Sequence, residues 1–296
     1  MTSDANAAIG QGPVLVRGLG DVASAVAHRL FREGLAVALH NGPDPPKTHR
    51  RAMSFADAYF DTTATLDGIA ARRLDDTWQL PEALRDHMAI PVLVAHFEAC
   101  LAALHWSLLV DAGLRKRAEP ERQRGSAPLV IGLGPGFVAG LNCDMAIETS
   151  WGPRLGTIIH EGPTLPFTGE PRAIAGVGRE RIVYASVAGT FRATSAIGAS
   201  VAAGEILGAI EGHPIAAPIS GTIRGLVRGG IAVTAGDKLV EIDPRDAALA
   251  NFSGLGERPG RLADAVVEAI RLWRAAQTTG DERGAAGPSP DVRSQT

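Results

Sequence analysis

The sequence predicts an α/β protein in which a parallel-sheet domain precedes a smaller β domain. Three observations support this prediction. Residues 14–39 have the size and order of a βαβ unit, with a strand, a glycine turn, a helix and a second strand. Further apolar runs at 90–95 and 127–131 add strands to the same sheet. Residues 185–210 are repeated as residues 217–242, with short strands between glycines in both copies.

Composition limits the class of protein. The chain has 296 residues, of which 45% are hydrophobic, so it is long enough for two domains. Its net charge of −3 argues against a basic surface for nucleic acid or an anionic membrane. We expect a cytoplasmic protein, because the first residues lack the pattern of a signal peptide and no apolar run reaches membrane-spanning length. The two cysteines form no Cys-x-x-Cys motif, which fits a reducing compartment.

The opening βαβ unit is built around a turn with the spacing Gly-x-Gly-x-x-Ala. The apolar run Val14–Val16 leads into Gly18, Gly20 and Ala23, and the following apolar positions recur at helical spacing until Gly34 ends the helix. Such a turn leaves backbone N–H groups unpaired at a helix N-terminus, where the helix dipole also favours an anion. The turn therefore predicts a phosphate-bearing or pterin-type ligand. Alternatively, the glycines only allow the helix to pack closely on the strand.

The residues near this turn depart from a standard nucleotide site. A dinucleotide-binding domain normally carries Asp or Glu after its second strand, whereas this chain has His40 and Asn41 there. Asp21 stands at the helix start, where it repels phosphate unless a cation bridges the two; otherwise it caps the helix. Arg50 and Arg51 either contact an acidic ligand at the turn or form a solvated charged face. NAD is therefore less expected than another phosphate-bearing ligand.

Apolar periodicity predicts the other elements of the first domain, which we assign to residues 13–172. In chain order these are a helix at 54–60, an edge strand at 64–74, a helix at 81–88, a strand at 90–95, a helix at 97–104, and strands at 106–110, 127–131 and 146–149. Asp111 and Lys116 follow one of these strands. Because strand exits face the ligand crevice of a parallel sheet, both are candidate site residues, although an Asp there is as often a helix cap.

A second glycine turn contains Gly132, Gly134 and Gly136. A buried strand leads into this turn, as in the first. We expect the two turns to lie side by side where the sheet opens and to offer backbone amides to an anion. His160 follows in an exit loop without partners at metal-ligand spacing, so no metal site is predicted.

The second part, residues 173–246, is an internal repeat with an offset of 32 residues. Gly189–Arg192 matches Gly221–Arg224, Val201–Leu207 matches Val233–Leu239, and ten of 26 aligned positions are identical. The repeat predicts a pseudo-two-fold β domain and resembles the barrel-sandwich hybrid of biotinyl and lipoyl carriers. Those carriers attach their cofactor to a lysine in the hairpin between the copies. Ile210–Ile215 contains no lysine here, so neither biotin nor lipoate is expected.

Three segments flank these domains. Residues 1–12 and 278–296 are rich in small and polar residues, which predicts a flexible and a disordered tail. Residues 247–277 contain an amphipathic helix over Arg258–Ala276. Its apolar stripe should dock on a neighbouring element.

Several stretches together indicate a known family. They are Arg17–Ser24, Arg50–Phe55, Val110–Lys116, Pro128–Phe137, Glu148–Thr149, Thr168–Gly169 and Ala217–Arg245. On these motifs, over residues 13–275, the chain resembles the YqeB-like accessory proteins of the selenium-dependent molybdenum hydroxylase system, and more distantly the XdhC/CoxI proteins. The resemblance implies a Rossmann-like first domain and a role near the molybdenum cofactor, more than a particular reaction. The chain departs from the family in having Leu19 in place of a glycine and no carboxylate after the second strand.

Three functions are compatible with these features. The first is a maturation factor rather than an enzyme, which binds molybdenum cofactor or a nucleotide at the glycine turns and serves a partner molybdenum hydroxylase. The second is an NAD(P)-dependent oxidoreductase, for which the sequence offers no ribose-binding carboxylate. The third is a structural adaptor that acts through the β domain. Sulfur or selenium transfer through Cys143 is disfavoured, because Asp144 would raise the pKa of its thiol.

Overall fold

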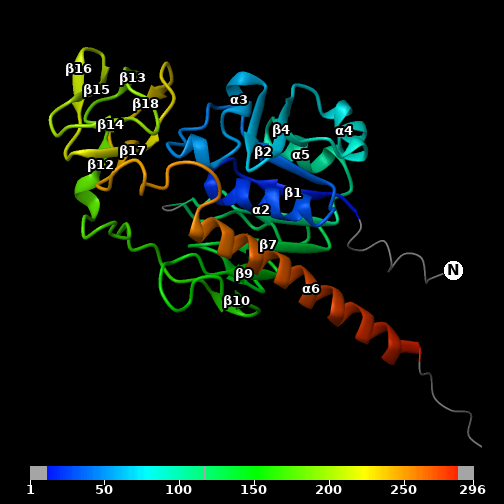
Figure 1. The fold of residues 1–296 in the computed structure, drawn as a ribbon. Coiled ribbons are helices and arrows are strands. Elements are labelled where there is room, and N and C mark those ends of the chain that lie inside the picture. The colour runs from blue at the N-terminus through cyan, green and yellow to red at the C-terminus, as the bar shows by residue number, and fades with distance from the viewer. Residues whose placement is uncertain (1–11, 116–117, 286–296) are drawn as a thin grey trace, which may run out of the picture.

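A nine-stranded sheet forms the centre of the molecule (Figure 1). The computed structural model describes residues 12–115 and 118–285. The strand order is β10-β9-β7-β6-β1-β2-β5-β4-β3; the seven strands from β9 to β4 are parallel, and β10 and β3 add antiparallel edges. The bounds are β1 (Val14–Arg17), β2 (Val37–Asn41), β3 (Thr63–Leu66), β4 (Ile69–Leu74), β5 (Ile90–Val94), β6 (Leu108–Asp111), β7 (Leu129–Leu133), β9 (Met145–Ile147) and β10 (Ile158–Ile159). The fold is therefore mixed α/β.

The opening βαβ unit is confirmed. Helix α2 (Asp21–Arg32) connects β1 to the parallel strand β2, and the turn before it contains Gly18. Gly18 has a φ of 114°, and a Cβ there would lie 3.1 Å from the carbonyl oxygen of Ala112. A larger residue at this position would therefore be strained and crowded. Gly34, with a φ of 81°, follows the helix as predicted.

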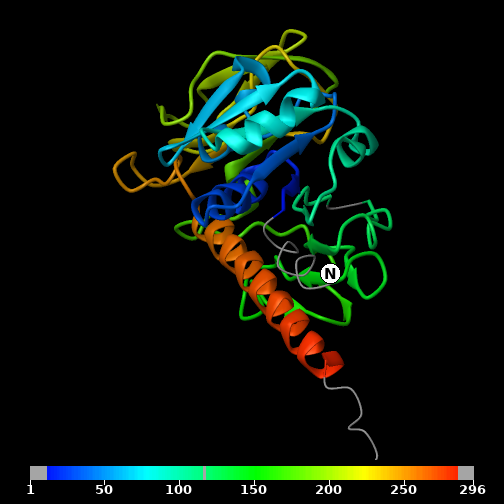
Figure 2. The ribbon, with the colours of Figure 1, turned by 90° about the vertical axis from the view of Figure 1, so that its right-hand side faces the viewer.

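Helices cover the two faces of the large sheet. Helix α6 (Glu257–Ala285) packs beside α2 on one face, where Val26, Leu30, Val266 and Ile270 share a core with the strands (Figure 2). The opposite core contains α4 (Leu80–Asp86) and α5 (Phe97–Ala103). Docking of the amphipathic segment is thus confirmed. The backbone of α6 continues to Ala285, so the prediction of a disordered tail from 278 is wrong for residues 278–285. Residues 286–296 and 1–11 lie outside the described residues.

Two local predictions are wrong. Residues 63–74 form a hairpin of two strands rather than one edge strand, because Asp67 and Gly68 both adopt positive φ and close a two-residue turn. The predicted helix at 54–60 is replaced by a 3-10 turn η1 (Arg51–Met53) and a short helix α3 (Ala58–Asp61). The Ser24 hydroxyl accepts a hydrogen bond from the backbone N–H of Phe55 at 2.9 Å, so a contact from α2 engages this segment before α3 begins.

The repeat folds into a separate set of strands, which we call the β unit (residues 182–243). Its strands are β12 (Ile182–Tyr184), β13 (Gly189–Ala193), β14 (Ser200–Val201), β15 (Ile206–Ile210), β16 (His213–Ala216), β17 (Gly221–Leu226), β18 (Ala232–Val233) and β19 (Lys238–Asp243). They form two four-stranded sheets, β12-β19-β17-β14 and β16-β15-β13-β18. The 32-residue offset carries β12–β15 onto β16–β19 and so exchanges the two sheets, as the pseudo-two-fold repeat predicts. Phe191, Leu207, Ile223 and Leu239 lie in the shared core.

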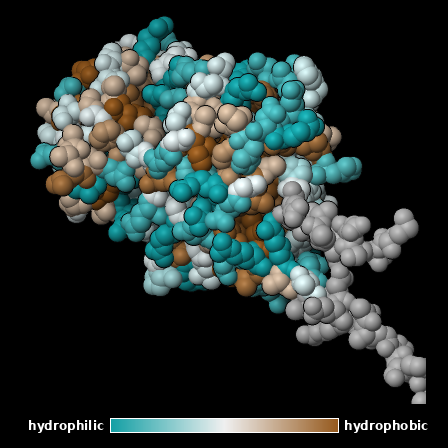
Figure 3. All heavy atoms as spheres, turned by 45° about the vertical axis from the view of Figure 1, so that its right-hand side comes forward, coloured by the Kyte–Doolittle hydropathy of each residue, from teal (hydrophilic) through white to brown (hydrophobic). Residues whose placement is uncertain are grey.

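The remaining elements are short. Strands β8 (Val138–Ala139) and β11 (Gly162–Pro163) pair in a small sheet, and two further 3-10 turns are η2 (Thr77–Gln79) and η3 (Arg179–Arg181). Hydrophilic and hydrophobic side chains are interspersed on the face drawn in Figure 3. Within the ranges that the structure describes, none of the helices combines the length and apolar character needed to cross a bilayer.

Candidate functional site

The first glycine turn has open space at its second glycine. Gly20 is the N-cap of α2, makes no side-chain cap hydrogen bond and has a φ of −78°. In the described part of the chain, a Cβ built on Gly20 would meet nothing within 4 Å. The start of a twelve-residue helix is therefore accessible here, with its dipole directed at the opening.

Asp21, the next residue, is neutralised by Arg50. Its Oδ2 accepts a hydrogen bond from Arg50 Nη1 at 2.8 Å, while its Oδ1 accepts one from the backbone N–H of Val22 at 3.1 Å. Burial would raise the pKa of Asp21, but the Arg50 guanidinium outweighs it and keeps the pKa below its usual value. The prediction that Asp21 caps the helix is wrong, because Gly20 is the N-cap; the Asp21 carboxylate bonds to the first turn of the helix, and its charge is paired with Arg50.

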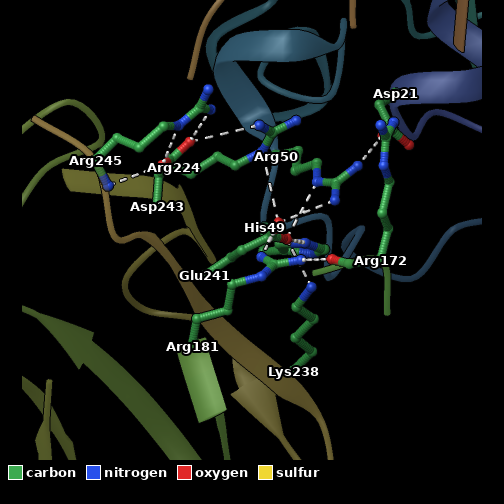
Figure 4. A network of polar contacts seen from close by, with 10 residues as sticks. All are labelled: Asp21, His49, Arg50, Arg172, Arg181, Arg224, Lys238, Glu241, Asp243 and Arg245. Atoms are coloured by element: carbon green, nitrogen blue, oxygen red, sulfur yellow. Dashed lines mark hydrogen bonds and ion pairs between the residues drawn. The ribbon is translucent and has the colours of Figure 1, made fainter. Parts of the chain in front are cut away.

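Arg50 also binds a buried carboxylate of the β unit (Figure 4). Its Nη2 and Nε donate to the two oxygens of Glu241, at 3.0 and 3.2 Å. Glu241 is fully buried and also accepts hydrogen bonds from Arg181 at 2.6 Å and from Lys238 at 2.7 Å. Burial would raise the pKa of Glu241, but the surrounding cations, Arg50 foremost, hold it well below its usual value.

These residues belong to one network, which we call the junction cluster. Its members are Asp21, His49, Arg50, Arg181, Arg224, Lys238, Glu241, Asp243 and Arg245. His49 Nε2 lies 2.9 Å from Glu241. Burial, and next the positive charge of Lys238, lower the pKa of His49 to about 4, so its ring is neutral at pH 7 and donates from Nε2. The cluster connects the glycine turn to the β unit.

Asp111 belongs to a second cluster. Its carboxylate is buried at the end of β6 and accepts hydrogen bonds from Arg17 at 3.3 Å and from Arg115 and Gln123 at 2.5 Å each. Arg17 also pairs with Glu121 and lies over the ring of Phe97, 3.8 Å from its centroid. Asp111 is therefore fully engaged by its own neighbours. Lys116 lies outside the described residues.

His40 occupies the position where a nucleotide domain carries its ribose carboxylate. Its Nε2 lies 3.0 Å from the carbonyl oxygen of Ala95, and its buried Nδ1 has no hydrogen-bond partner among the described residues. Burial lowers the pKa of His40, so the ring is neutral at pH 7. A neutral buried ring offers one acceptor atom here in place of a charged carboxylate.

The second glycine turn lies at the same edge of the sheet, but not beside the first. Strand β6 separates β7 from β1, and the residues after β6 fill the space: a Cβ on Gly134 would lie 3.0 Å from Leu114. Each glycine has a packing reason. A Cβ on Gly132 would lie 2.1 Å from the Phe137 ring, and one on Gly136 would lie 2.7 Å from Pro120. These contacts explain the glycines without a ligand.

Arg51 points away from Arg50. Its Nε donates to the carbonyl oxygen of Leu226 at 3.0 Å and its Nη1 to Asp57 at 2.8 Å. It therefore helps to hold the β unit in place rather than facing Asp21. Within residues 12–115 and 118–285, no group of three or more His, Cys, Asp or Glu side chains could hold a metal ion.

Sequence reasoning missed the β-unit half of the junction cluster. The signal was the strand Lys238-Leu-Val-Glu-Ile-Asp243, in which two carboxylates interrupt an otherwise apolar run. Buried carboxylates need cationic partners, which this chain supplies as arginines. A groove of about 430 Å³ lies elsewhere, lined by residues such as Leu35, Val267 and Arg271. The groove also carries charged residues, Glu33, Arg271 and Arg274, but we place the candidate site at the junction because buried carboxylates and arginines converge there beside the first glycine turn.

The comparisons with known proteins give one relative and no function. No protein family model matches the chain. The chain is similar to the "Uncharacterized protein YqeB" of Escherichia coli (strain K12), with 35% identity over 259 residues. The match includes 88% of this chain but 47% of the relative, so the chain spans about half the length of that protein. This similarity supports the resemblance to YqeB-like proteins and says nothing of an activity.

Proposed function

We propose that this protein binds a phosphate-bearing cofactor, either of the molybdopterin type or a nucleotide, and acts as a non-catalytic accessory factor for a molybdenum hydroxylase. The cofactor's phosphate would lie beside Gly20 at the start of α2. The link to a molybdenum hydroxylase comes from the resemblance to YqeB-like accessory proteins. The E. coli relative supports that resemblance.

The Asp21–Arg50 contact is the observation on which the ligand class depends. A free carboxylate at the start of α2 would repel a phosphate. Because Arg50 Nη1 lies 2.8 Å from Asp21, that negative charge is paired, which reduces its repulsion of a phosphate at the open position beside Gly20. Arg258 reinforces the same region: it donates to the carbonyl oxygen of Thr149 at 2.8 Å and is close enough to Asp21 to lower its pKa.

The strand order favours a ligand at this edge. We interpret the order β5-β2-β1-β6-β7-β9 as Rossmann-like: successive strands are added on one side of β1 up to β5 and on its other side from β6 onwards. Ligands of such sheets bind outside the carboxyl ends of the strands at this switch point. The β unit, which we interpret as a barrel-sandwich hybrid, meets the same edge through Arg50 and Glu241. It would close one side of the site and offer a surface to the hydroxylase.

The ligand class can be tested at Gly20. Gly20→Glu places a carboxylate in open space at an unstrained backbone position, so the protein should fold normally. Titration calorimetry would compare the wild type and this variant with molybdopterin, its cytosine dinucleotide form, ATP and NADH. We expect saturable binding of at least one phosphate-bearing ligand, weakened at least about tenfold by the added charge. Ala102→Glu, on the exposed side of α5, is the charge-matched control and should bind as the wild type does.

The partner can be tested on protein purified from its native host. Molybdenum analysis and mass spectrometry of the co-purifying proteins should detect a hydroxylase with the wild type and less of it with Gly20→Glu. If none of the four ligands binds saturably, the cofactor proposal is wrong. If the wild type and Gly20→Glu capture a hydroxylase equally although Gly20→Glu binds no cofactor, the result would instead support an adaptor role.

A further inference from the structure

Arg224 is a largely buried arginine without a close carboxylate partner. Its side chain is 14% exposed, and its nearest carboxylate oxygens lie at 3.5 Å, on Glu241, and at 3.9 Å, on Asp243. In the part of the chain that the structure describes, its buried Nε makes no hydrogen bond. This Nε is the atom that lies 3.5 Å from Glu241, so the contact is a long ion pair rather than a hydrogen bond, and a buried N–H donor without an acceptor is costly.

The neighbouring carboxylates are already occupied. Both oxygens of Asp243 accept hydrogen bonds from Arg245, at 2.8 and 2.6 Å. Glu241 is shared among Arg50, Arg181, Lys238 and His49. Glu241 can therefore not pair closely with Arg224 without releasing another cation, and Asp243, which is held by Arg245, lies 3.9 Å from Arg224 Nη1. Figure 4 shows Arg224 in the midst of these residues, with Asp21 on the far side of Arg50.

The junction cluster carries more positive than negative charge. Its cations are Arg50, Arg181, Arg224, Lys238 and Arg245, and its anions are Asp21, Glu241 and Asp243. With His49 neutral, the five cations of this cluster outnumber its three anions. Burial and the nearby charge of Arg50 lower the pKa of Arg224, which shows that its charged form is disfavoured here. Arg181 is 2% exposed, and among residues 12–115 and 118–285 its Nε likewise finds no hydrogen-bond partner. An oxyanion would relieve both conditions.

We propose that Arg224 is the principal side chain of a phosphate-binding site at the junction cluster, in which Arg50 and Arg181 assist. Its ligand is a phosphate or diphosphate group, either free or part of a larger molecule. The side chains of Arg224 and Arg50, 14 and 23% exposed, keep the cluster accessible to solvent. The identity of the larger molecule rests on the proposed function, whereas the site itself does not.

The internal repeat supplies a matched control. Arg192 occupies the position in the first copy that Arg224 occupies in the second, 32 residues later, but Arg192 is exposed. Arg224→Gln and Arg192→Gln therefore remove the same charge from equivalent strands. Only the first removes it from the junction cluster.

The test is calorimetric titration of the full chain with inorganic phosphate, pyrophosphate and ATP at constant ionic strength. We expect Arg224→Gln to raise the dissociation constant for pyrophosphate at least about tenfold, and Arg192→Gln to change it less than about twofold. Arg224→Lys should retain part of the affinity. In buffer without phosphate, Arg224→Gln should melt at the same temperature as the wild type or higher, because the cluster loses an uncompensated charge.

The outcomes separate this proposal from the preceding one. Pyrophosphate binding that Arg224→Gln leaves unchanged overturns the Arg224 site, and so does a large loss of stability in that variant without phosphate. Phosphate binding that depends on Arg224, without binding of any cofactor, supports the site and counts against the accessory function. Tighter binding of ATP than of pyrophosphate assigns the phosphate to a larger molecule, and equal binding assigns the site to free phosphate or diphosphate.

Discussion

Arg50 Nη1 lies 2.8 Å from the Asp21 carboxylate, and through this contact the glycine turn is connected to the β unit. The other guanidinium nitrogens of Arg50 donate to Glu241, which lies 191 positions later in the chain. One side chain thus joins the start of α2 to the interior strand β19. A planar guanidinium can hold two carboxylates in this way, whereas a lysine ammonium offers a single point of attachment.

Arg50→Gln should destabilise the protein by about 2 kcal/mol, the usual cost of losing hydrogen bonds between charged groups at a partly buried site. Glu241 keeps Arg181 and Lys238, so we expect folding to survive. Urea denaturation measures the change. Arg50→Lys should recover less than half of the loss, because lysine cannot bridge both carboxylates.

Arg192→Gln is the control for this measurement and should change stability by less than about 0.5 kcal/mol, since the side chain is exposed. If Arg50→Gln is as neutral as this control, the bridge between Asp21 and Glu241 does not stabilise the fold.

The strands of the fold could be predicted from the sequence because their signals are local. The run Ile90–Val94 is apolar throughout, as a strand buried on both faces must be. The internal repeat predicted the strands of the β unit and the pseudo-two-fold relation between its two sheets. The Thr63–Leu74 hairpin was missed because its turn residues, Asp67 and Gly68, stand within a weakly alternating stretch.

The site was only half predicted because its contacts are not local. Asp21 and Arg50 were identified from their position near a glycine turn, but nothing near Arg50 in the sequence indicates Glu241. Arg192 and Arg224 are equivalent in the repeat and yet differ in burial. This difference depends on how the β unit meets the large sheet, which no local pattern encodes.

Stability should fall between pH 6.5 and about 4 because of His49. The usual pKa of a histidine, 6.5, applies to the unfolded chain, whereas the pKa of His49 in the folded protein is about 4. In this range the unfolded chain therefore binds a proton that the folded protein does not. Stability therefore rises with pH, with a slope of up to about 1.4 kcal/mol per pH unit from this residue. Below pH 4.5 the loss continues, because the stabilisation from the lowered pKa of Glu241 is complete only above the usual value of 4.5 and decreases as the pH falls towards the pKa of the folded state.

His49→Gln keeps a donor for Glu241 and should make the profile less steep between pH 4 and 6.5; the slope that remains comes from His28 and His40, whose pKa values burial also lowers. The measurement is the urea midpoint at intervals of half a pH unit. His105 is exposed and does not belong to the junction cluster, so His105→Gln should leave the slope unchanged. Parallel profiles for the wild type and His49→Gln would show that His49 titrates normally.

The two cysteines should be unreactive in the folded protein. Burial raises the pKa of Cys100 to about 11 and that of Cys143 to about 12, so both thiols are protonated at neutral pH. We expect Ellman's reagent to modify neither thiol within minutes in the native protein at about pH 7.5. Both thiols should react once the protein is unfolded in about 6 M urea. Rapid reaction of Cys143 in the native protein would restore a sulfur- or selenium-transfer role.

Gly132→Ala tests whether the second glycine turn is shaped by packing. The new Cβ would lie 2.1 Å from the Phe137 ring, which is buried and must therefore shift. We expect a loss of about 2 kcal/mol in unfolding free energy, the cost of overpacking a core. Backbone strain does not contribute, because Gly132 does not have a positive φ.

A second substitution separates packing from other effects. Phe137→Leu should relieve part of the clash. The double variant should therefore lose less unfolding free energy than the sum of the losses in the two single variants. Gly42→Ala, at an open position with an ordinary φ, controls for the methyl group itself and should be nearly neutral. If Gly132→Ala is as mild as Gly42→Ala, the Phe137 ring does not fill that space, and the backbone at Gly132 is again available to a ligand.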